Sequence, residues 1–458
     1  MSFIWQALWF VVAVSLLVTV HEFGHFWVAR RLGFKVLRFS VGFGRPLLSR
    51  VAGADRTEYV LAAIPLGGYV KMLDEREGPV DPADLARSFT RRPPWQRIAV
   101  LLAGPGFNIA FAIVVLWGML WASGVNEVKP VVGDVMVNSV AARGGLHSGD
   151  EILAINGAAV SGQRDVVFDL LDAVSSGANA TLSVRGKDGA TRAATLDVPN
   201  ADERKRLTEP SALFSGLGFQ FWEPSVPAIV REVIAGGPAA AAGLKPGDQI
   251  LSIDDKPVDF RGFVPRIEAE IGRTVLIHYR RGTLENSARV TVVSETVEGK
   301  AVGRIKLLIG FPPGTKYPAD MITHTDFSAG VALSRAAAEA WNMTVLQGRL
   351  FGRMVTGQVS LKNLSGPLSI AQFAGESAEA GVAPFLEFLV LISLTLGFMN
   401  LLPIPILDGG QIVFQVVEWL KGSPLSERAQ AFGQQLGIAL LILLMGVALF
   451  NDIARQFG

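Results

Sequence analysis

Two histidines and a glutamate stand within five residues near the start of the chain, in the stretch VTVHEFGHFWVARR (18–31). On a helix, His21 and His25 share one face because they are four residues apart. Glu22 lies beside that face. This H-E-x-x-H spacing is typical of zinc hydrolases, in which the imidazoles bind the ion and the glutamate takes a proton from water. The alternative is a set of polar residues that caps an apolar helix.

The motif lies inside an apolar run, from residue 3 to residue 28, that is long enough to span a membrane. An ionisable side chain inside a span costs about 2.5–3.5 kcal/mol even on a lenient insertion scale. These residues therefore indicate a function. Glu22 precedes Arg30 by eight residues, which corresponds to roughly 12 Å of helix. If the arginines mark the membrane surface, the site lies inside the bilayer, toward that surface.

A catalytic zinc ion needs a third protein ligand. The chain has five histidines and no cysteine, and the other three histidines fall outside the apolar runs, so we expect a carboxylate near a span. Of Glu387, Glu418 and Asp408, we favour Asp408. It lies near the end of the segment MNLLPIPILDGG (399–410), whose prolines must break a helix. Non-helical backbone at membrane depth is tolerated only where protein or a water-filled cavity surrounds it.

Two alternatives remain open in this segment. Asp408 could cap a helix that starts at Gly409, and the ligand and cap roles are compatible. Asn400 could donate to a substrate carbonyl or an oxyanion, or it could satisfy backbone groups that the break frees.

The composition excludes several classes of protein. Half of the 458 residues are hydrophobic and the net charge is +1, so nothing indicates a nucleic-acid partner. The lack of cysteine excludes disulfides, zinc–thiolate sites and thiol nucleophiles. We expect a polytopic α-helical membrane protein with four spans, at residues 3–28, 98–121, 384–402 and 431–450.

Arginines and lysines gather between the first two spans, as at Arg30, Arg31, Lys35 and Arg97. The positive-inside rule places this loop in the cytoplasm. Both termini and the long segment between the second and third spans are then expected outside.

That outer segment contains a repeat: GLHSGDEILAINGAAV (145–160) aligns with GLKPGDQILSIDDKPV (243–258). Each copy has a Gly-Asp turn and a short alternating strand, which predicts a small, mostly β domain present twice. The shared string resembles PDZ domains, which bind an extended peptide at a sheet edge. Two rigid spacers without a ligand are the alternative.

The expected domains follow from these elements. A helix over 327–354 has a polar face and should either lie on the outer membrane surface or pack under the two PDZ-like domains. The expected parts are an N-terminal membrane part (1–124), a first PDZ-like domain (125–220), a second PDZ-like domain (221–312), the surface helix with its connector (313–383) and a C-terminal membrane part (384–458).

The motifs together resemble the site-2 protease family of intramembrane metalloproteases. HEFGH in the first span and N-x-x-P-x-P-x-L-D-G-G in a later one carry the resemblance, and AGPGFN (103–108) matches the family's G-P-x-x-N element. The helix–PDZ–PDZ–helix order, FSVGFGRPL and IPLGGYVKMLDE look like the bacterial type that regulates sigma-E.

The resemblance implies roles for individual residues. His21, His25 and Asp408 would bind one zinc ion, and Glu22 would be the general base and later the acid. The remaining implied residues would contact substrate: Asn400, Pro403 and Pro405 in a loop, and Gly67, Gly68 and Tyr69 in a membrane-re-entrant hairpin over 59–72. By themselves, residues 59–72 predict only a strand and a turn.

The resemblance also implies a setting. The substrates would be single-pass membrane proteins of the anti-sigma factor type with a trimmed outer domain, together with remnant signal peptides. The protein would act in an envelope stress response, in contact with membrane lipid. It would lie in a bacterial inner membrane, with its termini and PDZ domains periplasmic. Two other hypotheses are a membrane-bound zincin that degrades misfolded proteins and a non-enzymatic PDZ scaffold.

Overall fold

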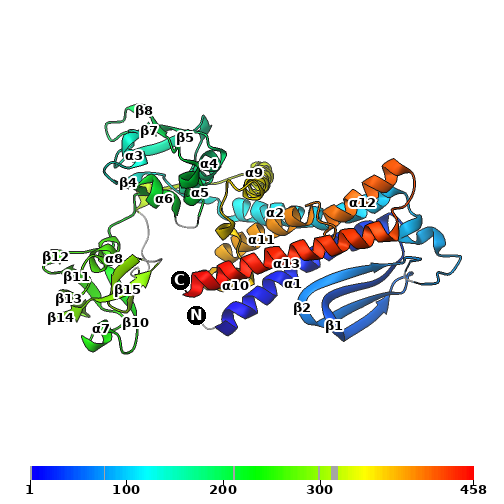
Figure 1. Ribbon diagram of the computed structural model, residues 1–458, viewed down its shortest axis with the longest axis horizontal. Helices are drawn as coiled ribbons and strands as arrows, with labels where there is room; N and C mark the ends of the chain where they lie inside the picture. The colour runs from blue at the N-terminus through cyan, green and yellow to red at the C-terminus, as the bar shows by residue number, and fades with distance from the viewer. Residues whose placement is uncertain (1–2, 77, 210–211, 298–299, 311–317, 458) are drawn as a thin grey trace.

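The computed structural model describes residues 3–76, 78–209, 212–297, 300–310 and 318–457. It is an elongated bundle of helices with a bent β-hairpin along one side and two β domains near one end (Figure 1). Both chain termini lie at the end of the bundle nearest the β domains (Figure 1).

Four helices of the described chain are long and apolar enough to cross a membrane. They are α1 (Phe3–Arg31), α2 (Pro94–Ser123), α11 (Val382–Asn400) and α13 (Glu427–Phe457). Each contains or overlaps one of the four expected spans. Helices long and apolar enough to span a membrane are therefore present at all four predicted positions.

Helix α2 lies at the centre of the bundle, where small residues let other helices approach. Its Ala112, Leu116 and Leu120 pack against α9 (Ala329–Val355) and α11. The side chains that α9 contributes are alanines at four-residue spacing: Ala332, Ala336 and Ala340. A separate cluster joins α1 to α10 (Pro367–Ala380) and α11.

The far end of α13 is fixed to the start of α10 by one carboxylate. Asp452 is 1% exposed and accepts hydrogen bonds from the backbone N–H groups of Gly366, Leu368 and Ser369. These are donors at a helix N-terminus, which have no partner within the helix. Asp452 thus caps a helix distant in sequence.

The hairpin consists of β1 (Val36–Ala52) and β2 (Thr57–Met72), and both strands bend. Residues 36–41 of β1 pair with two parts of β2, since Phe39 is opposite both Tyr59 and Val70. Residues 68–72 therefore form an outer arm of the small sheet. Residues 59–72 do not form a hairpin by themselves: they lie in β2, which begins two residues earlier, and the hairpin turns at residues 53–56.

The first β domain covers 129–221. Four strands form one sheet in the order β6-β5-β7-β8, and β4 pairs with β9. The strands are β4 (Val132–Val135), β5 (Glu151–Ile155), β6 (Ala158–Ala159), β7 (Ala180–Arg185), β8 (Thr191–Leu196) and β9 (Phe219–Phe221). The helices are α3 (Val140–Arg143), α4 (Gln163–Ser176), α5 (Ala201–Leu207) and α6 (Ala212–Leu217).

The second β domain covers 228–310 and has its own apolar core. Its main sheet runs β14-β13-β11-β10-β17, with β12 on β11, and β15 pairs with β16. The strands are β10 (Ala228–Val233), β11 (Gln249–Ile253), β12 (Lys256–Pro257), β13 (Thr274–Arg281), β14 (Leu284–Thr291), β15 (Val293–Val297), β16 (Lys300–Arg304) and β17 (Leu307–Gly310). The helices are α7 (Pro238–Ala241) and α8 (Phe260–Glu268).

The sequence repeat is also a repeat of structure. The Gly-Asp turns place Asp150 and Asp248 at 3% and 1% exposure, and each accepts from a backbone N–H three residues earlier. Each is also paired with an arginine from another strand of its domain, Arg192 of β8 or Arg281 of β13. A buried carboxylate needs such partners, and both copies of the repeat provide them.

Two short strands join the β domains to the membrane helices. β3 (Val125–Val128) follows α2 directly and pairs with β18 (Ile322–Thr325), which precedes α9. The expected boundary at 220/221 lies inside β9. The expected boundary at 312/313 lies outside the described residues.

The first β domain is fixed to α9 by ion pairs. Asp172 of α4 accepts from Arg349 and Arg353 of α9, at 3.2 and 2.8 Å. Arg164 pairs with Glu339. The expected helix over 327–354 is therefore observed as α9, and part of its polar face binds the first β domain.

Candidate metal centre

His21 and His25 lie on one face of α1, as their spacing predicts. Both are 8% exposed, and their Nε2 atoms are 3.2 Å apart. The rings are nearly perpendicular, with centroids 4.8 Å apart. The two nitrogens therefore point at a common position.

Asp408 brings a carboxylate to the same position. Its Oδ2 lies 3.1 Å from Nε2 of His21 and 3.4 Å from Nε2 of His25. This oxygen is buried and has no hydrogen bond of normal geometry within the described part of the chain. Asp408 starts α12 (Asp408–Lys421), where the N-cap position belongs to Leu407 and no side chain caps the helix.

The three atoms suit a tetrahedral zinc ion. Zinc binds imidazole nitrogen and carboxylate oxygen at about 2.0–2.2 Å, so two ligand atoms of a tetrahedron lie about 3.3 Å apart. The observed separations of 3.1, 3.2 and 3.4 Å match that edge. No other group of three or more metal-binding side chains is found in the described residues.

The chain folds back tightly just before and after Asp408. Residues 401–407 break the helical path between α11 and α12. A Cβ on Gly409 would lie 2.3 Å from the carbonyl oxygen of Leu401, and one on Gly410 would lie 2.1 Å from that of Ile404. The two glycines after the aspartate are therefore required by the close approach of α12 to the broken segment.

Helix α2 supports the histidines from the other side. Nδ1 of His25 lies 2.7 Å from the carbonyl oxygen of Val100, and Nδ1 of His21 lies 3.2 Å from the amide of Asn108. Gly104, between them, lies directly against both rings. On α1, Gly24 permits this approach, since a Cβ there would lie 2.4 Å from the carbonyl oxygen of Ala103.

The outer arm of the hairpin lies beside Glu22. An ideal Cβ on Gly68 would be 3.1 Å from Cγ of Glu22, so the backbone of the arm lies directly against this side chain. Gly67 lies under the ring of Phe43, which also stacks on Tyr69. Of the three hairpin residues named from the sequence, Gly68 therefore contacts the predicted base, whereas Gly67 and Tyr69 contact Phe43.

The residues before Asp408 have separate positions. The amide of Asn400 donates to the carbonyl oxygen of Leu396, one turn earlier in α11. Pro403 is exposed. Pro405 packs under α13 at Gly437, and its carbonyl oxygen accepts from Gln411.

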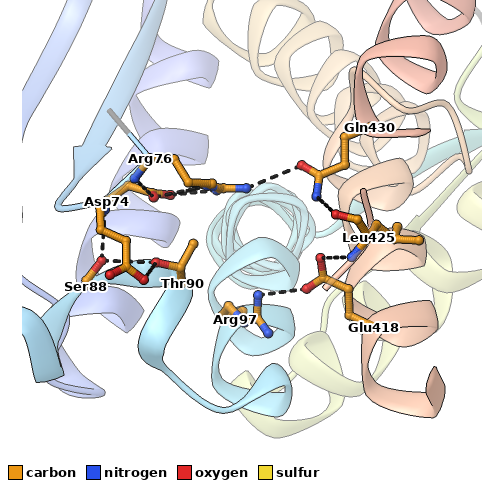
Figure 2. A network of polar contacts seen from close by, with 9 residues as sticks. Asp74, Arg76, Ser88, Thr90, Arg97, Glu418, Leu425 and Gln430 are labelled. Atoms are coloured by element: carbon orange, nitrogen blue, oxygen red, sulfur yellow. Dashed lines mark hydrogen bonds and ion pairs between the residues drawn. The ribbon is translucent and has the colours of Figure 1, made fainter. Parts of the chain in front are cut away.

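The carboxylates that we did not favour lie elsewhere. Glu387 lines a cavity of about 1030 Å³ between α2, α11 and the first β domain. Glu418 forms an ion pair with Arg97 at 3.0 Å, and both side chains are nearly buried. The pair belongs to a polar network that joins the chain after β2 to α2, α12 and α13 (Figure 2).

The family model "Peptidase family M50" matches residues 9–444. The chain belongs to peptidase family M50. This is the site-2 protease family that the motifs predict, and the protein is accordingly a zinc metalloprotease of the membrane.

Relatives of the peptidase match along its whole length. The regulator of sigma-E protease RseP of Escherichia coli K12 is 39% identical over 458 residues, covering 99% of this chain and all of its own. The regulator of sigma E protease of Salmonella typhi is 40% identical over 460 residues, with the same coverage. A Neisseria meningitidis chain named as a zinc metalloprotease is 38% identical and covers 98% of this chain and 99% of its own.

Among solved structures, PDZ domains match a small part of the peptidase. The PDZ domain of the SdrC-like protein of Listeria monocytogenes is 24% identical, with a TM-score of 0.17. The match covers 19% of this chain and 92% of that domain.

The contribution of α2 to the site is not among the sequence-based predictions. AGPGFN is identified there only as a family element, and Gly104 and Asn108 have no predicted role. A signal was present, because Val100, Gly104 and Asn108 are spaced by four and so share a helix face. Only the crossing with α1 shows what that face contacts.

Proposed function

We propose that the peptidase hydrolyses peptide bonds inside membrane-spanning helices of single-pass proteins. One observation carries the proposal: His21, His25 and Asp408 converge among helices that are apolar enough to span a membrane. A soluble zincin would have its site outside such helices. Hydrolysis within a span requires buried polar groups and broken backbone, and residues 401–407 supply the latter.

In this proposal, His21, His25 and Asp408 hold the zinc ion. The bound ion would supply Lewis-acid polarisation and lower the pKa of bound water to about 7. Glu22 takes a proton from the attacking water and delivers it to the leaving nitrogen. The close approach of the backbone at Gly68 limits where the Glu22 carboxylate can lie.

A helical substrate must unwind before it is cut, because its carbonyls are engaged in internal hydrogen bonds. The arm 68–72 pairs on one side with 36–41 and lies beside Glu22. We propose that an unwound substrate strand adds to this arm, with Gly67, Gly68 and Tyr69 along its path. Asn400, Pro403 and Pro405 would border the same path from the other side.

The proposed topology places the arginine-rich loop in the cytoplasm of a bacterial inner membrane, which the positive-inside rule supports. The termini and the two β domains, interpreted as PDZ domains, are then periplasmic. Relatives named for sigma-E regulation support substrates of the anti-sigma factor type and a role in envelope stress. Remnant signal peptides, also single apolar helices, fit the same site.

The test is to map the cut. Purified peptidase in lipid is incubated with a tagged single-pass protein whose outer domain has been removed, and the products are identified by mass spectrometry. The proposal predicts cleavage within the apolar span. Cleavage confined to segments outside the span would support a zincin that acts at the membrane surface, and would contradict the proposal.

A further inference from the structure

We infer that Asn108 of α2 is a positioning residue for the metal centre, whose side-chain oxygen accepts the Nδ1–H of His21. It thereby holds Nε2 of His21 toward the ion. The inference rests on the proposed metal site and adds a residue to it.

The contact is deep inside the protein. Asn108 is 0% exposed, and its side-chain amide lies 3.2 Å from Nδ1 of His21. Nε2 of the same ring faces His25 and Asp408. Oδ1 of Asn108 is buried and has no hydrogen-bond partner among the described residues.

The chemistry of the ring decides which amide atom must face it. An imidazole that binds a metal through Nε2 carries its proton on Nδ1, which then donates to a neighbouring acceptor. The amide nitrogen of Asn108 cannot accept that proton. A half-turn of the amide plane exchanges nitrogen and oxygen and brings the unpartnered Oδ1 to Nδ1.

His25 has an equivalent support, which shows the pattern. Its Nδ1 lies 2.7 Å from the carbonyl oxygen of Val100. His21 and His25 lie one turn apart on α1. Val100 and Asn108 lie two turns apart on α2, and Gly104, midway between Val100 and Asn108, lies against both histidine rings. One face of α2 therefore provides an acceptor for each histidine.

Asn108 is itself held in place by α11. The hydroxyl of Ser393 donates to the carbonyl oxygen of Asn108 at 2.8 Å, and Ser393 is fully buried. Gly397 lies against Cβ of Asn108. Because Asn108 is completely buried, it cannot touch a substrate, so it acts through His21.

The experiment measures zinc affinity by competition with a chelator, using full-length purified protein. Asn108→Leu keeps a similar volume but removes the acceptor, and Asn108→Asp keeps an acceptor. Asn451→Leu is the control, because Asn451 is also a buried amide in a membrane helix but bonds to the carbonyls of Leu361 and Leu364.

We expect Asn108→Leu to weaken zinc binding by about 10–100-fold, the usual effect of losing such a partner. Asn108→Asp should bind zinc at least as tightly as wild type. The zinc affinity of Asn451→Leu should be close to that of wild type. With cobalt(II) in place of zinc, the visible spectrum should change in Asn108→Leu and not in Asn451→Leu.

Wild-type zinc affinity in Asn108→Leu would overturn the inference. A tenfold loss in Asn108→Asp would overturn it as well, even if Asn108→Leu failed to fold. The proposed site fails differently: then His21→Ala and Asp408→Ala would also keep wild-type zinc affinity.

Discussion

Gly104 of α2 and His25 of α1 approach so closely that a Cβ on Gly104 would lie 2.3 Å from Nε2 of His25. The same atom would lie 2.7 Å from Cε1 of His21. The metal centre therefore depends on a position where α2 has no side chain.

Gly104→Ala should displace both imidazoles, although alanine favours helices over glycine by about 1 kcal/mol. A misplacement of that kind costs on the order of 10²-fold in activity, and we expect zinc to bind more weakly. Gly106→Ala is the matched control, because a Cβ at Gly106 meets nothing within 4 Å. Equal cleavage rates and zinc contents in the two variants would contradict this packing.

Asp408→Ala should lower the zinc content measured by atomic absorption after dialysis against a weak chelator, because the site loses one of three proposed ligands. Glu387→Ala removes a carboxylate from a neighbouring membrane helix and should keep the wild-type content. Full zinc occupancy in Asp408→Ala would remove this residue from the ligand set.

Several features of the centre could be predicted because their signals are local. The spacing of His21 and His25 is visible in five residues, and the broken helix before Asp408 is visible from its prolines. The apolar runs gave the four candidate spans for the same reason.

Other features depend on which surfaces meet, so no short pattern reveals them. Asn108 contacts His21 only because α2 crosses α1 at Gly24 and Gly104. Asp452 caps α10 across 86 residues of sequence, as its bond to Gly366 shows. The second pairing of β1, with residues 68–72, follows from bends that alternation alone does not predict.

The buried ion pair between Arg97 and Glu418 connects α2 to the helix that Asp408 begins. Arg97→Leu should destabilise the protein by about 3–5 kcal/mol, because it leaves the Glu418 carboxylate buried without its cation. Changing both residues, to Leu and Met, should recover most of that loss. Thermal unfolding in detergent measures both effects, and equal stability of the single and double variants would contradict the prediction.

Asp172 fixes the first β domain to α9 through two arginines. Asp172→Ala should weaken this contact by about 1 kcal/mol, since the pairs are partly exposed. Hydrogen exchange in α4 and in 349–355 should then become faster, whereas Asp134→Ala, a change at an exposed aspartate of the same domain, should leave both segments unchanged. Unaltered exchange in Asp172→Ala would show that other contacts hold the domain.

The most direct test of the account compares wild-type peptidase with Glu22→Gln on the trimmed single-pass substrate, each with and without a zinc chelator. Cleavage by the wild type alone is expected, with the chelator stopping it and added zinc restoring it. Glu22→Gln should retain zinc but cut at least about 10²-fold more slowly, because a general base contributes that much. Chelator-resistant cleavage, or wild-type rates in Glu22→Gln, would contradict a zinc centre served by this glutamate.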